Sequence, residues 1–358
     1  MTSVGVHADR RDRLRALLAK EHPGSVLLLT DLSNVRYLTG FSGSNAVLAI
    51  GADPSSDLIG TDGRYRDQVT EQTPDVPSLI DRETLQAVAT RVRSSIVVEP
   101  DLGVGQFTSL RDAGLSVEVG TSLVQPLRAV KDGGEIEALA RACAITVEAF
   151  AALAAEIRVG ARELVLARRL EQLFGDLGAE DRAFDTIIAA GPHSAIPHHE
   201  PGDRVLAAGD LLVIDAGARV DGYHADMTRT FIVAAEPEPW QEQIHAIVRD
   251  AQAAATARYV PGAERLAIDA AAREPITAAG FGEAYTHGLG HGVGLDIHEA
   301  PSIGALSTGT IEANMAITVE PGIYLTGRGG VRIEDTLVVT DAGPRILTEA
   351  PRDLLVVG

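Results

Sequence analysis

Two aspartates eleven residues apart, Asp215 and Asp226, lie in segments that otherwise have the composition of β-strands. Residues 211–214 form a short apolar run, and residues 228–233 mix β-branched with aromatic side chains. Aspartate is disfavoured inside strands, so its presence at both places calls for a chemical explanation. A bound cation is one chemistry that explains the pair.

Asp221 and Gly222, between these two segments, predict a hairpin turn. A hairpin centred between residues 220 and 221 places Asp215 directly opposite Asp226, with both side chains on one face of the sheet. Two like charges that face each other repel, so this register favours a positive group between them. The alternative is one buried aspartate and a second one at a solvated hairpin edge.

A cluster of histidines follows later in the chain. Eight of the ten histidines lie between residues 193 and 298, and His287, His291 and His298 are spaced by four and by seven residues. The glycines at every second position of residues 288–294 make a helix implausible there. Glycines let the backbone approach a ligand closely and let successive histidines point into one cavity. The alternative is a glycine-rich loop whose histidines are incidental.

Two glutamates belong to further predicted strands. Residues 316–320 are expected to form a strand that a Pro-Gly turn ends, with Glu320 as its last extended residue. Residues 330–340 are expected to form one apolar strand that carries Glu334, with Arg332 two residues earlier and therefore on the same face. Taken singly, Glu320 could be a solvated strand edge, and Arg332 with Glu334 a structural ion pair.

Four carboxylates and a histidine that converge on one sheet face are explained together by two divalent cations. Carboxylates can bridge two ions, and a water held between the ions loses a proton to become a nucleophile near neutral pH. Ligands that are mostly oxygen with one imidazole suit Mn²⁺, Fe²⁺, Co²⁺ and Zn²⁺, and residue type does not choose among these metals.

The elements that must position these residues fall into two domains, as a length of 358 residues also suggests. In the first third of the chain, short apolar runs alternate with helical stretches, which predicts an α/β domain with a mixed or parallel sheet. Its expected helix covers residues 11–20, and its expected strands cover residues 25–30, 45–50, 57–61 and 94–99.

A boundary is expected within residues 124–134, and the second domain is predicted to be α+β. Every polar motif described above lies on the sheet of this domain. One expected helix of this domain ends near residue 158, and two more cover residues 161–178 and 239–259. Its expected strands cover residues 184–189, 211–233, 316–320 and 330–340.

Composition restricts the partners and the compartment. The formal net charge of −19 argues against a nucleic acid as partner. No stretch approaches the ~20 apolar residues that span a bilayer, so no membrane is expected. The single cysteine, Cys143, cannot form an internal disulfide, which fits the cytoplasm, and it is expected to be a buried thiol.

At this point the motifs become those of a known family. Residues 215–217 with 225–230, 287–299, 318–324 and 330–335 resemble, in order, the motifs of the pita-bread metallopeptidases. These include Xaa-Pro aminopeptidase, prolidase, methionine aminopeptidase and the metal-free creatinase. The amino-terminal third is similar to the creatinase-type domain of the proline-specific branch. The resemblance implies an α/β creatinase-like domain over residues 1–126 and an α+β pita-bread catalytic domain over residues 127–358.

The resemblance implies five metal ligands for two divalent ions, Asp215, Asp226, His291, Glu320 and Glu334. In the family pattern Asp226 and Glu334 bridge the ions, Asp215 holds one ion, and His291 with Glu320 holds the other. Glu320 also takes the proton from the bridging water as it attacks the scissile carbonyl. Because all five ligand positions are filled, creatinase, whose relatives replace these ligands, is disfavoured.

The resemblance also assigns residues to the substrate. His287 and His298 are similar to the histidines that bind substrate and stabilise the tetrahedral intermediate. His198 matches a histidine near the pocket for proline, and His199 is the neighbouring alternative. Arg332 matches an arginine that orients the cluster.

One departure from the family pattern bears on the substrate. Prolidases carry an arginine shortly after the third histidine, where it can clamp the free carboxylate of a dipeptide. Residues 299–308 contain no arginine, and Ser302 stands near the expected position. This favours an aminopeptidase that removes any residue ahead of proline. A prolidase stays the alternative, because Arg328 or an arginine of a partner subunit could supply the charge.

The resemblance completes the expectations for this chain. The substrates are peptides with proline at the second position, Mn²⁺ is the first expectation for the metal, and the expected assembly is a homodimer in the cytoplasm. From a different class, a catalytically silent binding module of the same fold is the remaining alternative.

Overall fold

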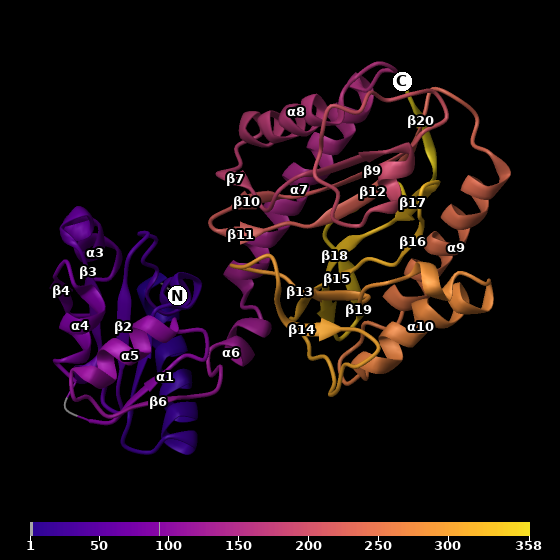
Figure 1. Cartoon of the computed structure of the whole chain (residues 1–358). Coiled ribbons are helices and arrows are strands. Elements are labelled where there is room, and N and C mark those ends of the chain that lie inside the picture. Colours follow the sequence, from indigo (N-terminus) through magenta and orange to yellow (C-terminus); the bar gives the residue numbers. More distant parts are fainter. Residues whose placement is uncertain (1–2, 93) are drawn as a thin grey trace. The chain divides into compact units, whose positions relative to one another are not determined.

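The computed structural model describes residues 3–92 and 94–358. The chain divides into two compact units, Met1–Arg128 and Ala129–Gly358, and Figure 1 follows the sequence through both of them. Each unit has its own sheet system and its own apolar core, and each is described by itself below.

The first unit is an α/β domain built on a mixed six-stranded sheet in the order β4-β3-β2-β1-β5-β6. β1 runs antiparallel to β2 and parallel to β5, so the sheet is mixed, as expected. The strands are β1 (Val26–Leu29), β2 (Val47–Ile50), β3 (Leu58–Thr61), β4 (Ser78–Ile80), β5 (Ile96–Val98) and β6 (Val117–Val119). The helices are α1 (Ser3–Glu21), α2 (Leu32–Thr39), α3 (Arg66–Gln72), α4 (Thr84–Ala89), α5 (Val104–Asp112) and α6 (Gln125–Ala129), with the 3-10 turns η1 (Pro54–Ser56) and η2 (Gly63–Tyr65).

The second unit is an α+β domain, as expected, with four long helices. These are α7 (Gly133–Glu156), α8 (Glu163–Asp176), α9 (Pro239–Thr256) and α10 (Arg265–Ala278), with the 3-10 turns η3 (Gly191–Ala195) and η4 (Gly282–Ala284). The sequence analysis did not identify α10, which contains Pro275 inside the helix. Proline removes a helical hydrogen bond, so a segment that contains it is a poor helix candidate until packing is known. Ile268, Ala272 and Ile276 bury the inner face of α10 in the core.

The strands of the second unit form four sheets. Their orders are β20-β12-β9-β8, β14-β13-β15-β18-β19, β11-β10-β7 and the pair β16-β17. The strands are β7 (Asp181–Arg182), β8 (Ile187–Ala190), β9 (Leu211–Ala216), β10 (Ala218–Val220), β11 (Tyr223–His224), β12 (Met227–Val233), β13 (Gly290–Gly292), β14 (Glu299–Ile303), β15 (Ala316–Val319), β16 (Gly322–Leu325), β17 (Gly329–Arg332), β18 (Asp335–Thr340), β19 (Gly343–Ile346) and β20 (Leu355–Val357).

The register of the β9–β12 hairpin differs from the expected one. Thr228, not Asp226, is the partner of Asp215, and the same register continues through β10 and β11. The hairpin is therefore centred between Asp221 and Gly222, whose φ angles are 50° and 77°. A tight hairpin turn with positive φ at both central residues explains this centre, because aspartate and glycine tolerate that conformation. The prediction that Asp215 faces Asp226 directly was wrong, because the partner of Asp215 lies two residues beyond Asp226.

The segment 330–340 is two strands rather than one. β17 pairs with β16, β18 pairs with β15, and Glu334 lies in the break between them. The apolar pattern of the sequence continues across the break because both strands are buried. A continuous run of buried residues does not reveal where a chain passes from one sheet to another.

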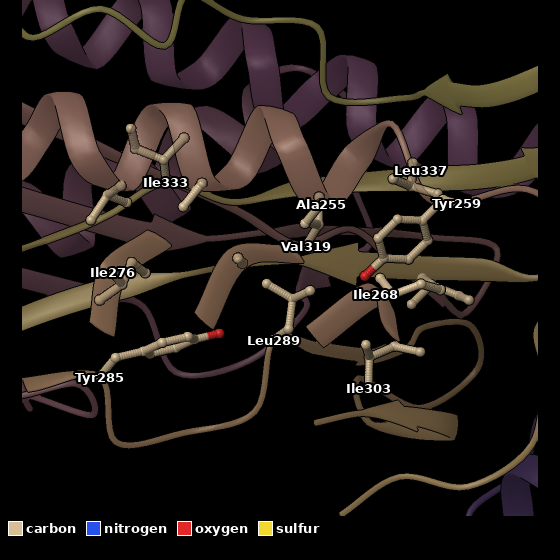
Figure 2. Close-up of a cluster of buried hydrophobic side chains, with 14 of the residues drawn as sticks. Ala255, Tyr259, Ile268, Ile276, Tyr285, Leu289, Ile303, Val319, Ile333 and Leu337 are labelled. Carbon is tan, nitrogen blue, oxygen red and sulfur yellow. The ribbon is translucent and has the colours of Figure 1, made fainter. Parts of the chain in front are cut away.

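Two apolar clusters fix the strand ends that carry the polar residues. One cluster contains Ile214, Ala216 and Met227, which flank the two aspartates. The other contains Val319 and Ile333, which precede the two glutamates. Figure 2 shows these last two side chains together with Leu289 of the histidine segment, packed among residues of helices α9 and α10. The polar residues therefore project from backbone that is anchored on both sides.

Helix α7 is a core helix of the second unit. Among the described residues it alone is long and apolar enough to cross a membrane by length and composition, and 44% of its most apolar window is buried inside the structure. The sequence was expected to contain no segment apolar enough to span a bilayer. The expectation holds for uninterrupted runs of apolar residues, but the mean hydropathy of α7 reaches the level of such a segment. Cys143 lies on the buried face of this helix, which confirms the expected buried thiol.

Candidate metal centre and active site

Four carboxylates from separate elements line one cavity of the second unit. Asp215 is on β9, Asp226 precedes β12, Glu320 follows β15, and Glu334 lies between β17 and β18. The aspartates and Glu334 are buried, and the Glu320 side chain is 18% exposed. The structure thus brings together all four acidic residues that the sequence singled out.

His291 completes this cluster. Its Nε2 atom lies 3.4 Å from Glu320 Oε1 and 3.6 Å from Asp226 Oδ2. One ligand atom each of His291, Asp226 and Glu334 lie within 4.8 Å of one another. Its other ring nitrogen, Nδ1, is 3.0 Å from the carbonyl oxygen of Gly292, which fixes the ring so that Nε2 faces the carboxylates.

Arg332 is the cation beside these carboxylates, and it pairs with Asp215. Its Nη2 donates to Asp215 Oδ2 at 2.6 Å, and its Nε donates to Thr228 Oγ1 at 3.1 Å. The Thr228 hydroxyl donates in turn to Glu334 Oε2 at 2.7 Å. The sequence left open a direct ion pair between Arg332 and Glu334. In the structure the Thr228 hydroxyl group connects the two side chains instead.

The carboxylates of the cluster carry more negative charge than its one guanidinium balances. Burial, followed by repulsion from Asp215 and Glu320, raises the pKa of Asp226 well above its usual value. Burial, followed by repulsion from Asp226 and Glu320, does the same to the pKa of Glu334. Burial also raises the pKa of Glu320 to about 8, although Arg332 opposes the change. One guanidinium does not neutralise four buried carboxylates.

The cluster fits divalent metal ions by its donors and by one unsatisfied atom. Asp215 Oδ1 is buried and has no hydrogen-bond partner among the described residues, although its Oδ2 is held by Arg332. A buried carboxylate oxygen without a partner is costly unless it coordinates a cation. Oxygen donors with one imidazole are a ligand set that divalent transition metals accept.

His287 and His298 line the same cavity beside the carboxylates. His287 Nε2 lies 2.8 Å from the Tyr324 hydroxyl, and its Nδ1 lies 2.8 Å from the carbonyl oxygen of Gly288. Burial lowers the pKa of His287 to about 4, and burial also lowers the pKa of His298. Both imidazoles are therefore neutral near pH 7, and each carries one N–H.

His198 and His199 both line the cavity, but their surroundings differ. His199 Nε2 lies 2.9 Å from the buried carboxylate of Glu163, so its ring is held by that residue. His198 is exposed and lines the same cavity as His287 and His298. The geometry thus favours His198 over its neighbour as the histidine that faces His287 and His298.

Three hydroxyl groups that support the cluster were not identified from the sequence. Tyr324 accepts from Arg332 Nη1 at 2.8 Å and thereby joins that residue to His287. Thr318 Oγ1 accepts from the His291 backbone N–H at 3.1 Å and lies 3.4 Å from Glu320 Oε1. Thr228 links Arg332 to Glu334. Each lies within a quoted motif, but hydroxyl residues are common in strands, so only their contacts distinguish them.

The glycines of the histidine segment serve the packing of the backbone. A Cβ atom on Gly290 would lie 2.1 Å from the Thr318 carbonyl oxygen, and one on Gly292 would lie 2.1 Å from that of Ala300. These residues let β13 fit between β14 and β15. The glycines were expected to let the backbone approach a ligand. At these two positions they instead let neighbouring strands of the protein approach closely.

The cavity has a volume of about 960 Å³ and extends beyond the carboxylates. Residues of α8, among them Leu164 and Arg168, also line it, together with Arg182 and residues 184–187. The expected position for a carboxylate clamp, Ser302, lies on β14 opposite His291, and Arg328 stacks on Trp240 with its guanidinium carbon 4.1 Å from the ring centre.

A buried group of four carboxylates and one imidazole, bordered by neutral histidines in an open cavity, defines a metal-dependent hydrolase. Residues 137–341 match the model of metallopeptidase family M24, and residues 10–130 match that of the creatinase/prolidase N-terminal domain. The chain belongs to metallopeptidase family M24. It is a metallopeptidase with the pita-bread fold, which confirms the resemblance stated from the sequence.

Named relatives carry both proline-specific activities. The chain is 44% identical over 233 residues to the Xaa-Pro dipeptidase of Pyrococcus furiosus, which covers 65% of this chain and 67% of the relative. The structure of an Xaa-Pro dipeptidase from Bacillus anthracis matches with a TM-score of 0.94 at 33% identity, over 98% of this chain and 100% of that one. The X-Pro aminopeptidase from Thermotoga maritima matches with a TM-score of 0.88 at 34% identity, over 97% and 99%.

Proposed function

We propose that this chain is a dinuclear metal-dependent aminopeptidase that hydrolyses the bond between an N-terminal residue and proline. The observation that carries the metal assignment is the buried carboxylate cluster with its one unpaired oxygen, Asp215 Oδ1. The residues that would hold the two ions are Asp215, Asp226, His291, Glu320 and Glu334. Asp226 and Glu334 are the proposed bridging ligands, as the family resemblance implies, and together with His291 they offer ligand atoms within 4.8 Å of one another.

The protein groups have separate roles in the proposed reaction. Two divalent ions would polarise the scissile carbonyl and make water a nucleophile near neutral pH. The Glu320 carboxylate accepts the proton of the attacking water and later returns it to the leaving amine. His298 donates its N–H to the oxygen that gains charge, a contribution worth ~10²–10³ in rate per donor. His287, whose single N–H is donated to the Gly288 carbonyl oxygen, borders the substrate in the same cavity. Arg332 orients Asp215.

Peptide length is the property that separates the two proline-specific activities. A volume of about 960 Å³ lies at the upper end of the ~300–1,000 Å³ range of ligand pockets and exceeds what a dipeptide needs. Ser302 stands where a clamping arginine is expected in a prolidase, and Arg328 is held on Trp240. Room for a longer chain without a clamp for a dipeptide carboxylate supports the aminopeptidase.

A prolidase is the second candidate, and specific residues favour it. Arg168 and Arg182 line the cavity and could attract a substrate carboxylate. Two of the three relatives described above are dipeptidases. Arg182 already pairs with Glu171 at 2.6 Å and with Asp185 at 2.6 Å, which weakens its part in this alternative.

A comparison of Gly-Pro with Ala-Pro-Ala tests the proposal. The purified chain, stripped of metal and reconstituted with Mn²⁺, should release alanine from the tripeptide with a kcat/KM at least equal to that for the dipeptide. Ala-Ala-Ala serves as the control for proline specificity. An intact tripeptide with a cleaved dipeptide would make the chain a prolidase, and inactivity on every proline peptide with every metal would overturn both activities.

Three finer expectations belong to this proposal. Mn²⁺ is the expected native metal, a homodimer is the expected assembly, and the cytoplasm is the expected compartment. Elemental analysis of protein purified without added metal, light scattering of the same sample, and fractionation of cells test these in turn.

A further inference from the structure

A second group of metal-ligating side chains lies outside the carboxylate cluster. His193 Nδ1 lies 2.9 Å from Glu163 Oε1, and His199 Nε2 lies 2.9 Å from Glu163 Oε2. One ligand atom of each of the three residues lie within 4.8 Å of one another. The two imidazole rings are 4.3 Å apart between centres. None of these residues has a role in the hydrolysis proposed above.

The carboxylate of this group is built in rigidly. Glu163 is the first residue of α8, its side chain is fully buried, and the backbone N–H of Ala190 donates to Oε1 at 2.8 Å. The N–H of Gly202 lies 3.3 Å from Oε2. Such outer hydrogen bonds orient a carboxylate ligand and hold it ionised. Burial alone raises the pKa of Glu163, but the hydrogen bonds from Ala190 and the two imidazoles lower it overall.

The two histidines come from separate turns of the same segment and leave one side of the group open. His193 lies in η3 and its side chain is 37% exposed, whereas His199 follows six residues later and its side chain is 11% exposed. Solvent therefore reaches the group from the side of His193, and a water molecule can occupy a fourth position. Two imidazole nitrogens and one carboxylate oxygen, with a fourth open site, form a ligand set that Zn²⁺ accepts in tetrahedral geometry.

We propose that Glu163, His193 and His199 bind a third divalent ion of the zinc class, separate from the catalytic pair. The ion takes the place of the protons now shared between the carboxylate and the imidazoles. A ligand set with two imidazoles selects Zn²⁺ or Co²⁺ over Mg²⁺ and Ca²⁺, which prefer oxygen donors throughout.

The position of this site gives the ion a structural consequence. His198, which faces the substrate cavity, directly precedes the ligand His199. An ion that ties both ends of residues 193–199 to α8 fixes the backbone that carries His198. The third ion is thus expected to set the position of a substrate-binding histidine without contacting the substrate.

The test counts metal ions in variants whose catalytic pair is disabled. Metal-free Asp226→Asn protein, titrated with Zn²⁺ or Co²⁺, is compared with the double variant that also carries His199→Asn. We expect the two proteins to differ by one bound ion per chain, and the Co²⁺ form of the first to show the visible absorption of a tetrahedral site. Because the result is a difference between matched proteins, it does not depend on the pair or on activity.

Two further variants keep the test independent of folding. His193→Asn changes a partly exposed side chain, so the protein should stay folded while affinity at the third site falls by more than about 10²-fold. His22→Asn is the control, because His22 makes the same kind of contact with Glu118, at 2.9 Å, but without a second histidine. Equal metal content with and without His199, or loss of the ion in His22→Asn, would overturn the proposal.

Discussion

At the scale of single residues, the site is determined by an imbalance of charge. Arg332 neutralises Asp215, whereas Asp226 and Glu334 have no direct cation partner among the described residues, and their pKa values are raised well above the usual range. Neutral amides at these positions would remove the repulsion but also the attraction for divalent ions. The carboxylates thus gain their function from an arrangement that is unfavourable in the absence of metal.

Asp226→Asn should abolish hydrolysis, because the loss of a bridging charge separates the metal pair. We expect kcat/KM for a proline peptide to fall by at least about 10³-fold and elemental analysis to show the loss of bound metal. Asp221→Asn is the matched control, since Asp221 lies in the turn of the same hairpin, on the surface, beside Arg141. Retained activity with full metal occupancy in Asp226→Asn would contradict the bridging assignment.

The stability of the metal-free protein should depend on pH through Glu320. Burial raises the pKa of Glu320 to about 8 in the folded chain, whereas an unfolded glutamate titrates near ~4.3. Between these values the folded state holds the extra proton, so the free energy of unfolding falls as pH rises, by up to about 1.4 kcal/mol per pH unit. Calorimetry in chelator should give a steeper fall of Tm for wild type than for Glu320→Gln. Parallel curves for the two proteins would refute this origin.

At the scale of elements, a buried ion pair holds the end of the histidine segment, residues 287–299. Lys131 Nζ donates to Glu299 Oε2 at 2.8 Å, and both side chains are 1% exposed. Glu299 directly follows His298 and also accepts from the backbone N–H of Asp296 at 3.0 Å. The segment from β13 to β14 is therefore held in place by the ammonium group of Lys131, which lies near the start of the second unit.

Removal of this buried cation should be costly. Lys131→Met leaves the Glu299 carboxylate buried without its cation, so we expect the free energy of unfolding to fall by about 3–5 kcal/mol in chemical denaturation. The control is Arg162→Met, because Arg162 pairs with Asp203 at 2.9 Å on the surface, where loss of a pair costs less than about 1 kcal/mol. Equal effects of the two substitutions would show that burial does not set the strength of the pair.

At the scale of the whole molecule, the two units have independent cores. Residues Leu28, Val47, Val88, Ile96 and Leu110 form a buried cluster within the first unit. All five proposed metal ligands belong to the second unit. Because each unit buries its own apolar surface, folding of the first unit does not require the catalytic chemistry of the second.

The fragment Met1–Arg128, produced alone, should fold. We expect a cooperative thermal transition and no uptake of the metal pair, because the fragment contains a complete sheet and none of the ligands. The fragment Ala129–Gly358 should take up the ions that the first fragment does not. Circular dichroism and elemental analysis of both fragments measure this, and a first fragment that unfolds without cooperativity would contradict the independence of its core.

The sequence by itself determined the residue types of the site and the class of fold. Asp215, Asp226, Glu320 and Glu334 stand out because carboxylates interrupt segments that otherwise form strands. The family resemblance selected His291 among three histidines, and the structure gathers all five residues in one cavity. The alternation of strands and helices likewise predicted an α/β unit followed by an α+β unit. Such local patterns survive in the sequence because each strand or helix must present its own apolar face to a core.

Only the tertiary structure decided what these residues contact. The partner of Asp215 differs from the expected one by two residues because turn geometry, not charge repulsion, sets the register of the hairpin. The apolar run around Glu334 proved to be two strands of different sheets. Helix α10 was missed because packing outweighs Pro275. Asp215 as partner of Arg332, Glu163 as partner of His199 and His287 as partner of Tyr324 lie far away in the chain. No local pattern encodes these contacts. Asp215 and Asp226 were evident in the sequence, but the charge deficit they share with the two glutamates exists only where four strand ends meet.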